Sequence, residues 1–376
     1  MPDVLVTVDG RQVSVPSDST VLQAAEAAGV KIPTLCHHPA LEPIGACRMC
    51  LVEIEKQRGY HPACTFPVSA GIVVHTNSPG VRDARRFVLE LLLSDHPLDC
   101  MTCDQAGNCV LQDLAYEYGV KGSAFAGGKK HEYAIDDPNP FIQVDRNKCI
   151  LCRRCERACR HINGVEAISI VYRGFNAKIA FGMDSTMEDS PCEFCGSCVE
   201  VCPVGALWPK MSIGKGRPYQ LRQVETVCSY CGVGCKLVLH MRGNEIVKVT
   251  GADGAANHGF TCVKGRFGYD YVNHADRLSK PLMRRYLLEG KPKPRVHDSG
   301  NGHEHAPDPG MDWVEASWDE ALGLVARKWV ATKRDFGGDA FATLCSARCT
   351  NEENFVAAKL TRQLMETHNV DHCARL

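Results

Sequence analysis

Apolar and polar residues alternate with the two-residue period of a β-strand at the start of the chain. Residues 4–8 show this alternation, the Asp-Gly pair at 9–10 is a hairpin turn signal, and residues 12–15 return as a second strand. Residues 20–28 open with the Thr-x-x-Gln spacing of a capping box and stop before Gly29, which predicts a helix. The pattern therefore predicts a small mixed module of strands and one helix.

A longer segment has the 3.6-residue period of an amphipathic helix. It covers residues 81–94, and Phe87, Val88, Leu91 and Leu92 form one apolar stripe along it. Such a stripe is typical of a helix that packs one face against a core.

The remaining predicted elements are short strands and two further helices. The strands are expected at 236–240, 245–249 and 340–345, and the helices at 318–333 and 350–367. Residues 214–225 have the composition of a linker, as do residues 289–312, where His303 and His305 are expected to be exposed rather than metal-bound. The alternation of helix and strand from about residue 313 predicts the opening of an α/β domain.

Cysteine is the residue type that changes this picture most. The chain has 22 cysteines among 376 residues, and most of them, with one histidine, form spaced groups of four. The groups are Cys36/Cys47/Cys50/Cys64, His96/Cys100/Cys103/Cys109, Cys149/Cys152/Cys155/Cys159, Cys192/Cys195/Cys198/Cys202 and Cys228/Cys231/Cys235/Cys262. Four soft ligands are what an iron–sulfur cluster requires, so these groups predict a chain that conducts electrons. The cysteines left over, expected to be small packing residues, are Cys345, Cys349 and Cys373.

Two other uses of cysteine fit the chain less well. A disulfide scaffold suits short secreted chains, whereas this chain begins without the basic and apolar regions of a signal peptide. Zinc sites usually take two cysteine pairs per ion, whereas the Cys-x2-Cys-x2-Cys-x3-Cys runs crowd three thiolates onto one loop, as a cubane needs. Thiolate sites without an export signal predict a cytoplasmic protein.

Spacing also distinguishes the first two groups. The first has Cys-x10-Cys-x2-Cys-x13-Cys spacing, which on a β-grasp ferredoxin scaffold predicts a [2Fe–2S] site. The second has only three cysteines, and His96 stands where the fourth ligand of a [4Fe–4S] cluster is needed. The alternative for His96 is a partly cationic ring at the C-terminal end of a helix. A histidine ligand should raise the potential of this cluster relative to an all-cysteine neighbour.

The third and fourth groups repeat one another. Residues 149–159 and 192–202 both have the Cys-x2-Cys-x2-Cys-x3-Cys pattern of bacterial two-cluster ferredoxins, in which the fourth cysteine of each run ligates the other cluster. We therefore expect Cys202 to complete the first run and Cys159 to complete the second. Arg160 follows Cys159 where this pattern usually has proline, a departure that leaves the ligand count unchanged.

The cysteine groups predict an α+β multi-module fold with each module organised around metal. The expected domains are a [2Fe–2S] ferredoxin type at 1–79, a His/Cys3 [4Fe–4S] type at 80–120, a two-cluster ferredoxin type at 138–213, a small β cluster domain at 221–277 and an incomplete α/β domain at 278–376. A net charge of −1 gives no indication of a nucleic-acid partner, and no apolar run is long enough to span a membrane directly.

Particular stretches resemble known families. Residues 45–53 (Gly-Ala-Cys-Arg-Met-Cys-Leu-Val-Glu) and 96–100 (His-Pro-Leu-Asp-Cys) resemble the N-terminal segment shared by the large iron–sulfur subunit of complex I, cytoplasmic formate dehydrogenases and many [FeFe] hydrogenases. The fifth group, which ends in Cys262-Val-Lys-Gly, resembles the cluster domain that opens the molybdenum or tungsten bis-pterin oxidoreductases. A hydrogenase would have an H-cluster domain at this place instead.

Two features favour formate dehydrogenase over the complex I subunit. The complex I subunit usually lacks full ligation for the second paired cluster, whereas the cysteines of the 192–202 run are all present. Residues 346–354 and 369–376 closely resemble formate dehydrogenase catalytic subunits. This resemblance implies that Lys264, which would otherwise be interpreted as a surface lysine, lies between the fifth cluster and a pterin and helps to couple them electronically.

The resemblance implies formate oxidation to CO2, or the reverse, at a molybdenum or tungsten bis-MGD centre of a longer enzyme. Electrons would cross one [2Fe–2S] and four [4Fe–4S] clusters to a flavin- and NAD-binding diaphorase-type subunit, with ferredoxin or a hydrogenase subunit as other acceptors. The alternative is a complex I-like NADH dehydrogenase subunit that acts only as an electron wire.

The last residues also carry an expectation. In formate dehydrogenases the segment matching residues 369–376 runs directly into the cysteine or selenocysteine that binds the metal. We therefore expect the sequence to stop at a selenocysteine codon read as a stop. The 376-residue chain by itself should then be inactive toward formate, with no catalytic acid, base or nucleophile of its own.

Overall fold

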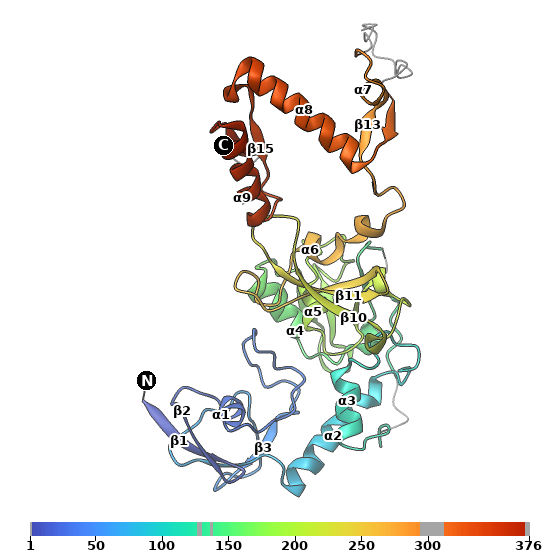
Figure 1. Ribbon diagram of the computed structural model, residues 1–376. Helices are drawn as coiled ribbons and strands as arrows, with labels where there is room; N and C mark the ends of the chain where they lie inside the picture. Colours follow the sequence, from blue (N-terminus) through green and yellow to red (C-terminus); the bar gives the residue numbers. More distant parts are fainter. Residues whose placement is uncertain (1, 126–129, 136–137, 294–311, 373–376) are drawn as a thin grey trace. The chain divides into compact units, whose positions relative to one another are not determined.

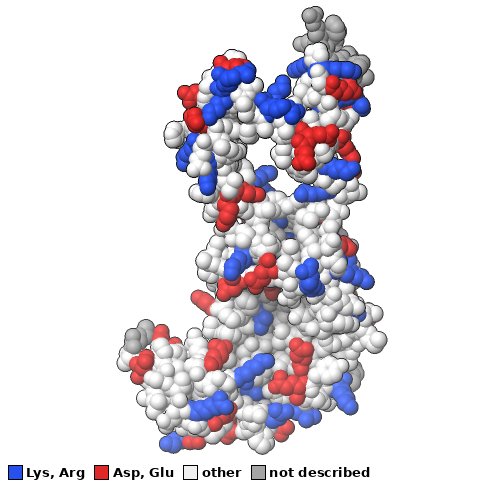
Figure 2. Space-filling model, viewed as in Figure 1, with Lys and Arg blue, Asp and Glu red and all other residues white. Residues whose placement is uncertain are grey.

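The computed structural model describes residues 2–125, 130–135, 138–293 and 312–372. It divides into two compact units, one of Met1–Val227 with Cys235–Tyr269 and one of Cys228–Gly234 with Asp270–Leu376. Figure 1 shows the ribbon coloured along the chain, and Figure 2 shows Lys and Arg interspersed with Asp and Glu on the visible face of both units. Among the described residues, no helix is both long and apolar enough to cross a membrane.

The first unit begins with a five-stranded sheet in the order β2-β1-β5-β3-β4 (Figure 1). Its elements are β1 (Asp3–Val8), β2 (Arg11–Pro16), α1 (Val21–Ala27), β3 (Leu51–Ile54), β4 (Tyr60–Pro62) and β5 (Val73–His75). β1 pairs antiparallel with β2 and parallel with β5. The predicted hairpin is confirmed, with Asp9 and Gly10 both at positive φ, and so is the capping box of Thr20 and Gln23. Buried valines such as Val6 and Val74 form the core under α1.

The predicted amphipathic helix is α2 (Pro79–Asp95), which is followed by α3 (Val110–Glu117). The predicted apolar stripe is confirmed at Val88 and Leu92, which pack against a buried core, and wrong at Phe87 and Leu91, which are 53% and 47% exposed. The buried positions are Val81, Arg85, Leu89 and Leu93, spaced four residues apart. Arg85 belongs to this face because its guanidinium donates to the Tyr118 hydroxyl (2.9 Å) and to the Leu51 carbonyl (2.6 Å).

A two-fold repeat of short elements follows. β6 (Ile142–Val144) pairs antiparallel with β9 (Leu207–Pro209), and β7 (Ile168–Val171) pairs antiparallel with β8 (Lys178–Phe181). The helices α4 (Arg154–Arg157) and α5 (Ser197–Val201) lie within the two cysteine runs. Single helical turns are Arg146–Lys148, Ala158–Ile162, Gly174–Asn176, Lys210–Ser212, Pro218–Gln220, Asp270–Asn273, Gly338–Ala340 and Thr361–Met365.

The first unit ends with a three-stranded antiparallel sheet and a short helix. The sheet contains β10 (Arg222–Val227), β11 (Lys236–Arg242) and β12 (Glu245–Gly251), and α6 (Val263–Phe267) follows it. The sequence places residues 222–225 in a linker, but they form the start of β10, because all six residues of β10 pair with β11. The two predicted strands at 236–240 and 245–249 are confirmed.

The second unit contains the antiparallel pair β13 (Leu282–Arg284) and β14 (Trp313–Glu315), with α7 (Arg285–Leu288) between them in the chain. The long helix α8 (Trp318–Phe336) is followed by β15 (Thr343–Cys345), α9 (Asn351–Leu360) and β16 (Val370–His372). β15 and β16 run parallel with α9 as the connection between them, which is the expected opening of an α/β domain (Figure 1). The predicted strand at 340–345 is shorter than expected, since 338–340 form a helical turn.

Some sequence expectations fall outside the described residues. These are the exposed positions of His303 and His305 and the packing of Cys373. The other two leftover cysteines, Cys345 and Cys349, are half-buried.

Candidate iron–sulfur sites

The first cysteine group lies in the loops beside the five-stranded sheet. The Cys36 amide donates to the Cys47 sulfur (3.3 Å), and the Cys47 amide donates to the Cys36 sulfur (3.4 Å). Hydrogen bonds from the Cys47 and Cys64 side chains lower the pKa of the Cys36 thiol to about 2, and one from Cys64 lowers the pKa of Cys50 to about 7. The same hydrogen bonds raise the pKa of the Cys47 and Cys64 thiols. The structure thus brings all four sulfurs together, and thiolate, the form that ligates metal, is favoured at Cys36 and Cys50.

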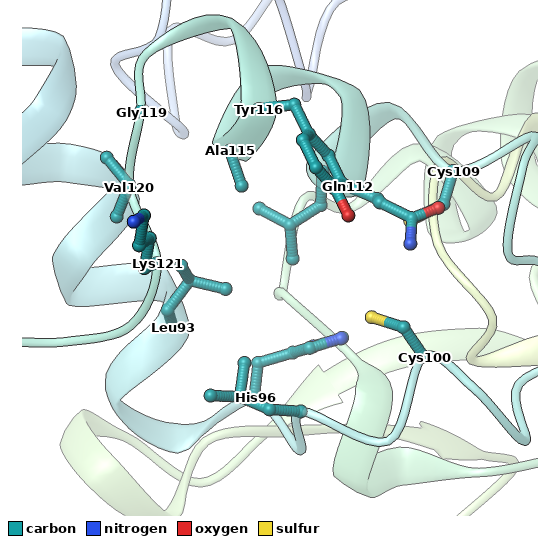
Figure 3. Close-up of a pocket in the computed structure, with 12 residues that line it drawn as sticks. Leu93, His96, Cys100, Cys109, Gln112, Ala115, Tyr116, Gly119, Val120 and Lys121 are labelled. Atoms are coloured by element: carbon teal, nitrogen blue, oxygen red, sulfur yellow. The ribbon is translucent and has the colours of Figure 1, made fainter.

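Three residues of the second group, His96, Cys100 and Cys109, line a cavity of about 560 Å³ between α2 and α3. Figure 3 shows the His96 imidazole and the Cys100 side chain pointing toward one another across this cavity, with Cys109 and apolar residues around them. His96 Nδ1 is buried and, among the described residues, has no hydrogen-bond partner. Burial also lowers the pKa of His96, which favours the neutral ring that binds metals. An orphaned imidazole nitrogen beside a thiol-lined cavity fits a cluster ligand.

Cys103, the remaining predicted ligand of this group, lies against the ferredoxin repeat. A Cβ added at Gly205 would be 2.8 Å from the Cys103 sulfur, so the absence of a side chain permits this approach. The Val110 amide donates to the Pro203 carbonyl at 3.0 Å, one residue beyond Cys202. The His96 group and the turn after Cys202 are therefore in direct contact.

The third group forms where the sequence repeat predicts it. One small cavity is lined by Cys149, Cys152, Cys155 and Cys202, so the last cysteine of the second run lies with the first three of the first run. Its other lining residues include apolar side chains such as Ile179. Burial raises the pKa of the Cys149 thiol to about 12 and of Cys152 to about 11. A thiolate here needs compensating positive charge, which iron would supply.

The fourth group mirrors the third. Burial, together with the charges of Cys195, Cys192 and Cys159, raises the pKa of the Cys198 thiol well above its ordinary value. The Cys195 sulfur also accepts a hydrogen bond from the Asn163 side-chain amide at 2.7 Å. Cys159 and Cys198 are buried in one apolar core, against which Cys192 packs, so Cys159 of the first run lies near the cysteines of the second.

The two runs share backbone geometry as well as spacing. Leu151 and Phe194, equivalent in the repeat, have φ values of 51° and 53°. Their amides donate to the sulfurs of Cys149 and Cys192, each at 3.4 Å. Such N–H···S bonds stabilise a charged cluster and help to set its potential.

Within the described ranges, no three His, Cys, Asp or Glu side chains are grouped to hold a single metal ion. A [4Fe–4S] cluster needs a wider arrangement of ligands than a single ion. Each of its four irons takes one protein ligand, so the four ligands are spaced around the cluster. The four groups have the donor chemistry that such clusters take, and their assignment as ligands stays a prediction.

The fifth group is divided between the two units. Cys228 and Cys231 belong to the second unit, whereas Cys235 and Cys262 belong to the first. This group, and the role of Lys264, therefore remain predictions from the sequence. Lys264 lies in the first turn of α6 and is exposed.

Two arginines inside the first run reach another ligand loop, and the sequence prediction missed both. Arg157 donates to the carbonyl of Cys36 (2.5 Å) and also to that of Glu42, and Arg154 donates to the carbonyl of His37 (2.5 Å). The sequence does place Arg154 and Arg157 between the cysteines of the first run. Cations at these positions could have indicated a contact with a second loop.

One apolar core joins three of the groups. Buried Leu35, Leu89 and Leu111 pack with residues that include Cys47, Cys109, Cys149 and Cys202. The [2Fe–2S]-type group, the His96 group and the third group therefore surround a shared, water-excluding core.

The second unit contains a cavity of about 520 Å³. It is lined by residues of both segments that the sequence analysis compared with formate dehydrogenases, among them Ser346, Asn354 and His372. The Asn354 side chain donates to the Ser346 carbonyl at 3.2 Å, which closes the loop after β15. Sequence-distant segments thus meet at one site.

Family models match successive parts of the chain. They describe a 2Fe-2S iron–sulfur cluster binding domain (residues 2–79), an NADH-ubiquinone oxidoreductase-G iron–sulfur binding region (85–124) and an NADH-quinone oxidoreductase subunit 3 ferredoxin-like domain (139–208). Two more describe a molybdopterin oxidoreductase Fe4S4 domain (221–274) and a molybdopterin oxidoreductase (277–376).

Curated relatives match almost the whole chain, which spans about two fifths of their length. A G-type subunit of NADH-quinone oxidoreductase from Rhizobium meliloti is 36% identical over 99% of the chain and 40% of the relative. The NADPH-Fe(3+) oxidoreductase subunit alpha of Geobacter sulfurreducens has the same identity and coverage. A Staphylococcus aureus protein with the provisional name formate dehydrogenase is 30% identical over 99% of the chain and 39% of its own length.

Among solved structures, a chain of an NAD+-reducing [NiFe]-hydrogenase in the H2-reduced state is similar, with a TM-score of 0.54 and 32% identity. The match covers 57% of this chain and 91% of that one. The chain therefore combines a 2Fe-2S cluster binding domain and an iron–sulfur region of the NADH-ubiquinone oxidoreductase G type with the Fe4S4 domain and the opening of a molybdopterin oxidoreductase domain.

Proposed function

We propose that the chain is the electron-transfer portion of a molybdopterin-dependent formate dehydrogenase, with one [2Fe–2S] and four [4Fe–4S] clusters on the five ligand groups. The observation that carries this proposal is the gathering of four groups of soft ligands in one unit whose ligand loops touch one another. Formate as the substrate is supported by the residues lining the cavity beside β15 and by the Staphylococcus aureus relative.

The full enzyme would convert formate to CO2 with release of two electrons and one proton. A molybdenum or tungsten bis-MGD group, when bound, supplies the two-electron chemistry at formate. The residues of this chain hold the clusters, exclude water from them and set their potentials through hydrogen bonds and nearby charge. Lys264, two residues after Cys262, would couple the fifth cluster to the pterin.

The contacts favour the third group as a branch point for electrons. Its ligand Cys202 precedes the turn that contacts the His96 group, and its helix α4 supplies Arg157, which contacts the loop of Cys36. Electrons could therefore leave the third group either through the His96 group or through the group that contains Cys36. One-electron carriers suit a flavin subunit that joins electrons into pairs for NAD, with ferredoxin or a hydrogenase subunit as other possible acceptors.

The first experiment measures metal and sulfide in the 376-residue chain purified without oxygen. We expect about eighteen irons per chain and a similar amount of acid-labile sulfide, from one [2Fe–2S] and four [4Fe–4S] clusters. The chain alone should show no formate oxidation. A colourless protein free of labile sulfide would overturn the proposal.

The second experiment uses the full-length gene product and separates the two candidate functions. Formate-dependent dye reduction, with molybdenum or tungsten in the protein, supports formate dehydrogenase. Intact clusters without either metal and without formate activity would favour an electron wire of the NADH-quinone oxidoreductase type, the function named for the Rhizobium meliloti relative.

A third experiment tests His96 as a ligand. We expect His96→Ala to remove or convert one paramagnetic signal while the others remain, because the other groups use separate side chains. Electron paramagnetic resonance of the reduced chain is the measurement. Unchanged spectra would make His96 a structural residue at the end of α2.

A further inference from the structure

Arg266 is a charged side chain with almost no exposure to solvent. It lies at the end of α6 and is 1% exposed, and its Nη2 is 2.6 Å from Oε2 of Glu200. Its Nε donates to the carbonyl of Cys195 at 3.3 Å. A buried charge is costly unless it is paired, so this arrangement requires a specific compensating partner.

The guanidinium end of Arg266 lies across the ligand loop of the fourth group. A Cβ added at Gly196 would be 2.2 Å from Cδ and 2.6 Å from Nε of Arg266. Gly196 has a φ of 76°, but the equivalent residue of the first run, Arg153, has a φ of 59° and a full side chain. Backbone conformation alone therefore does not demand glycine here, whereas the approach of Arg266 does.

The carboxylate partner is itself held in place. Oε2 of Glu200 also accepts a hydrogen bond from the Gly251 amide at 3.3 Å, and Glu200 follows the ligand Cys198 by two residues. Beside Arg266, the ring of Phe267 stacks on Phe141 with centroids 5.0 Å apart. Helix α6 is thus fastened to the ferredoxin repeat by an ion pair and by an aromatic contact.

The same helix begins at a predicted ligand of the fifth group. Cys262 is the N-cap of α6, and its carbonyl accepts a hydrogen bond from the Arg266 amide at 3.1 Å. One turn of helix therefore separates Cys262 from a buried cation that touches the loop of Cys195. Both ends of this connection belong to the first unit.

We propose that Arg266 is a positioning residue that raises the potential of the centre held by Cys159, Cys192, Cys195 and Cys198 and fixes Cys262 against that centre. This inference rests on the proposed function, because it requires clusters on these ligands. When one electron enters the centre, its negative charge increases by one and no bond forms or breaks. A nearby cation favours that reduced state, which raises the midpoint potential.

The test is a redox titration of the anaerobic full-length protein, followed by electron paramagnetic resonance. We expect Arg266→Gln to shift one midpoint to a more negative potential, because the cation is lost. Glu200→Gln should shift the same midpoint in the opposite direction, because the cation then lacks its counter-charge. Arg266→Lys should restore part of the first shift, which loss of packing alone would not explain.

A matched control comes from an exposed ion pair of the same unit. Lys215 pairs with Glu245 at 3.0 Å, and its side chain is 44% exposed, so Lys215→Gln should leave every midpoint unchanged. Intact clusters with an unshifted midpoint in Glu200→Gln would overturn the inference, even if Arg266→Gln fails to fold. Absence of clusters from the wild-type protein would instead overturn the proposed function.

Discussion

The two cysteine runs of the ferredoxin repeat share their cysteine spacing and two positive-φ positions but have opposite charge arrangements. In the first run, Arg154 and Arg157 belong to the ligand loop and reach outward to the loop of Cys36. In the second run, the position equivalent to Arg157 is Glu200, and the cation Arg266 comes from outside. Each loop thus contacts a neighbouring segment through a guanidinium group. In the first run the arginines belong to the ligand loop, whereas in the second run the arginine belongs to the neighbouring segment.

This difference shows how a duplicated ligand pattern can serve two different neighbours. The cysteine spacing and the N–H···S bond to the first cysteine are common to both runs, as expected if both hold the same kind of cluster. The residues between the ligands differ between the two runs, as Arg157 and Glu200 do at equivalent positions. The sequence of a run therefore encodes the cluster through its cysteines and the adjoining module through its other residues.

The largest expected effect comes from removing a ligand that one run lends to the other. Cys202→Ala should abolish the signal of the Cys149/Cys152/Cys155 centre and lower the iron content by up to about four atoms, although residue 202 belongs to the second run. Iron analysis with electron paramagnetic resonance is the measurement. Loss of the second-run signal instead would contradict the crossed arrangement. Cys345→Ser, outside all five groups, should leave the iron content unchanged.

A smaller but selective effect is expected at Gly205. Gly205→Ala places a methyl group 2.8 Å from the Cys103 sulfur, so the His96 centre must shift or lose this ligand while the two ferredoxin-type centres persist. The spectrum of the reduced protein should change in one signal only. Gly122→Ala is a suitable control, since nothing lies within 4 Å of its added Cβ. A wild-type spectrum in Gly205→Ala would show that the two loops do not constrain each other.

Substitution at Gly196 sharpens the comparison of the two runs. Gly196→Ala should lower the free energy of unfolding by about 2 kcal/mol, because the methyl group collides with Arg266 in addition to the strain at positive φ. Arg153→Ala, at the equivalent position, should cost less, since the Arg153 side chain is 49% exposed and its ion pair is with Glu156 of the same loop. Anaerobic denaturant titrations of both variants would compare them. Equal losses of unfolding free energy in the two variants would mean that Arg266 is not the reason for glycine at position 196.

The smallest expected effect concerns the contact between the first run and the sheet module. Arg157→Gln removes donors to the Cys36 and Glu42 carbonyls and should destabilise this contact by about 1.5 kcal/mol. Hydrogen exchange around Cys36 should accelerate while the iron content stays the same. Arg153→Gln, which removes a cation of the same loop that faces Glu156, should leave this exchange unchanged.

The sequence predicts local features of this molecule well. The hairpin at Asp9 and Gly10 and the capping box at Thr20 depend on residues within four positions of each other, so a pattern can reveal them. The grouping of Cys202 with the first run follows from a repeat visible in the sequence. These predictions succeed because the determining residues are close in the chain or repeat within it.

Contacts over long separations were not predictable in the same way. The predicted buried face of α2 is wrong at Phe87 and Leu91. The cation Arg85 is buried there because Tyr118 and Leu51 accept its hydrogen bonds, which no periodicity can indicate. Arg266 and Cys195 are 71 positions apart, and Arg157 and Cys36 are 121 apart. Such pairs follow from how modules dock, which depends on the whole fold.

The crossed arrangement of cysteines also constrains how the protein is made. On this arrangement, the centre of Cys149, Cys152 and Cys155 takes its fourth sulfur from Cys202. Cys159 belongs to the other centre, whose remaining cysteines lie at 192–198 and are synthesised later. A ribosome must therefore translate past codon 202 before both ferredoxin-type centres can be completed. Iron delivered earlier would find an open coordination position, so loading of the two centres is coupled to synthesis of the entire repeat.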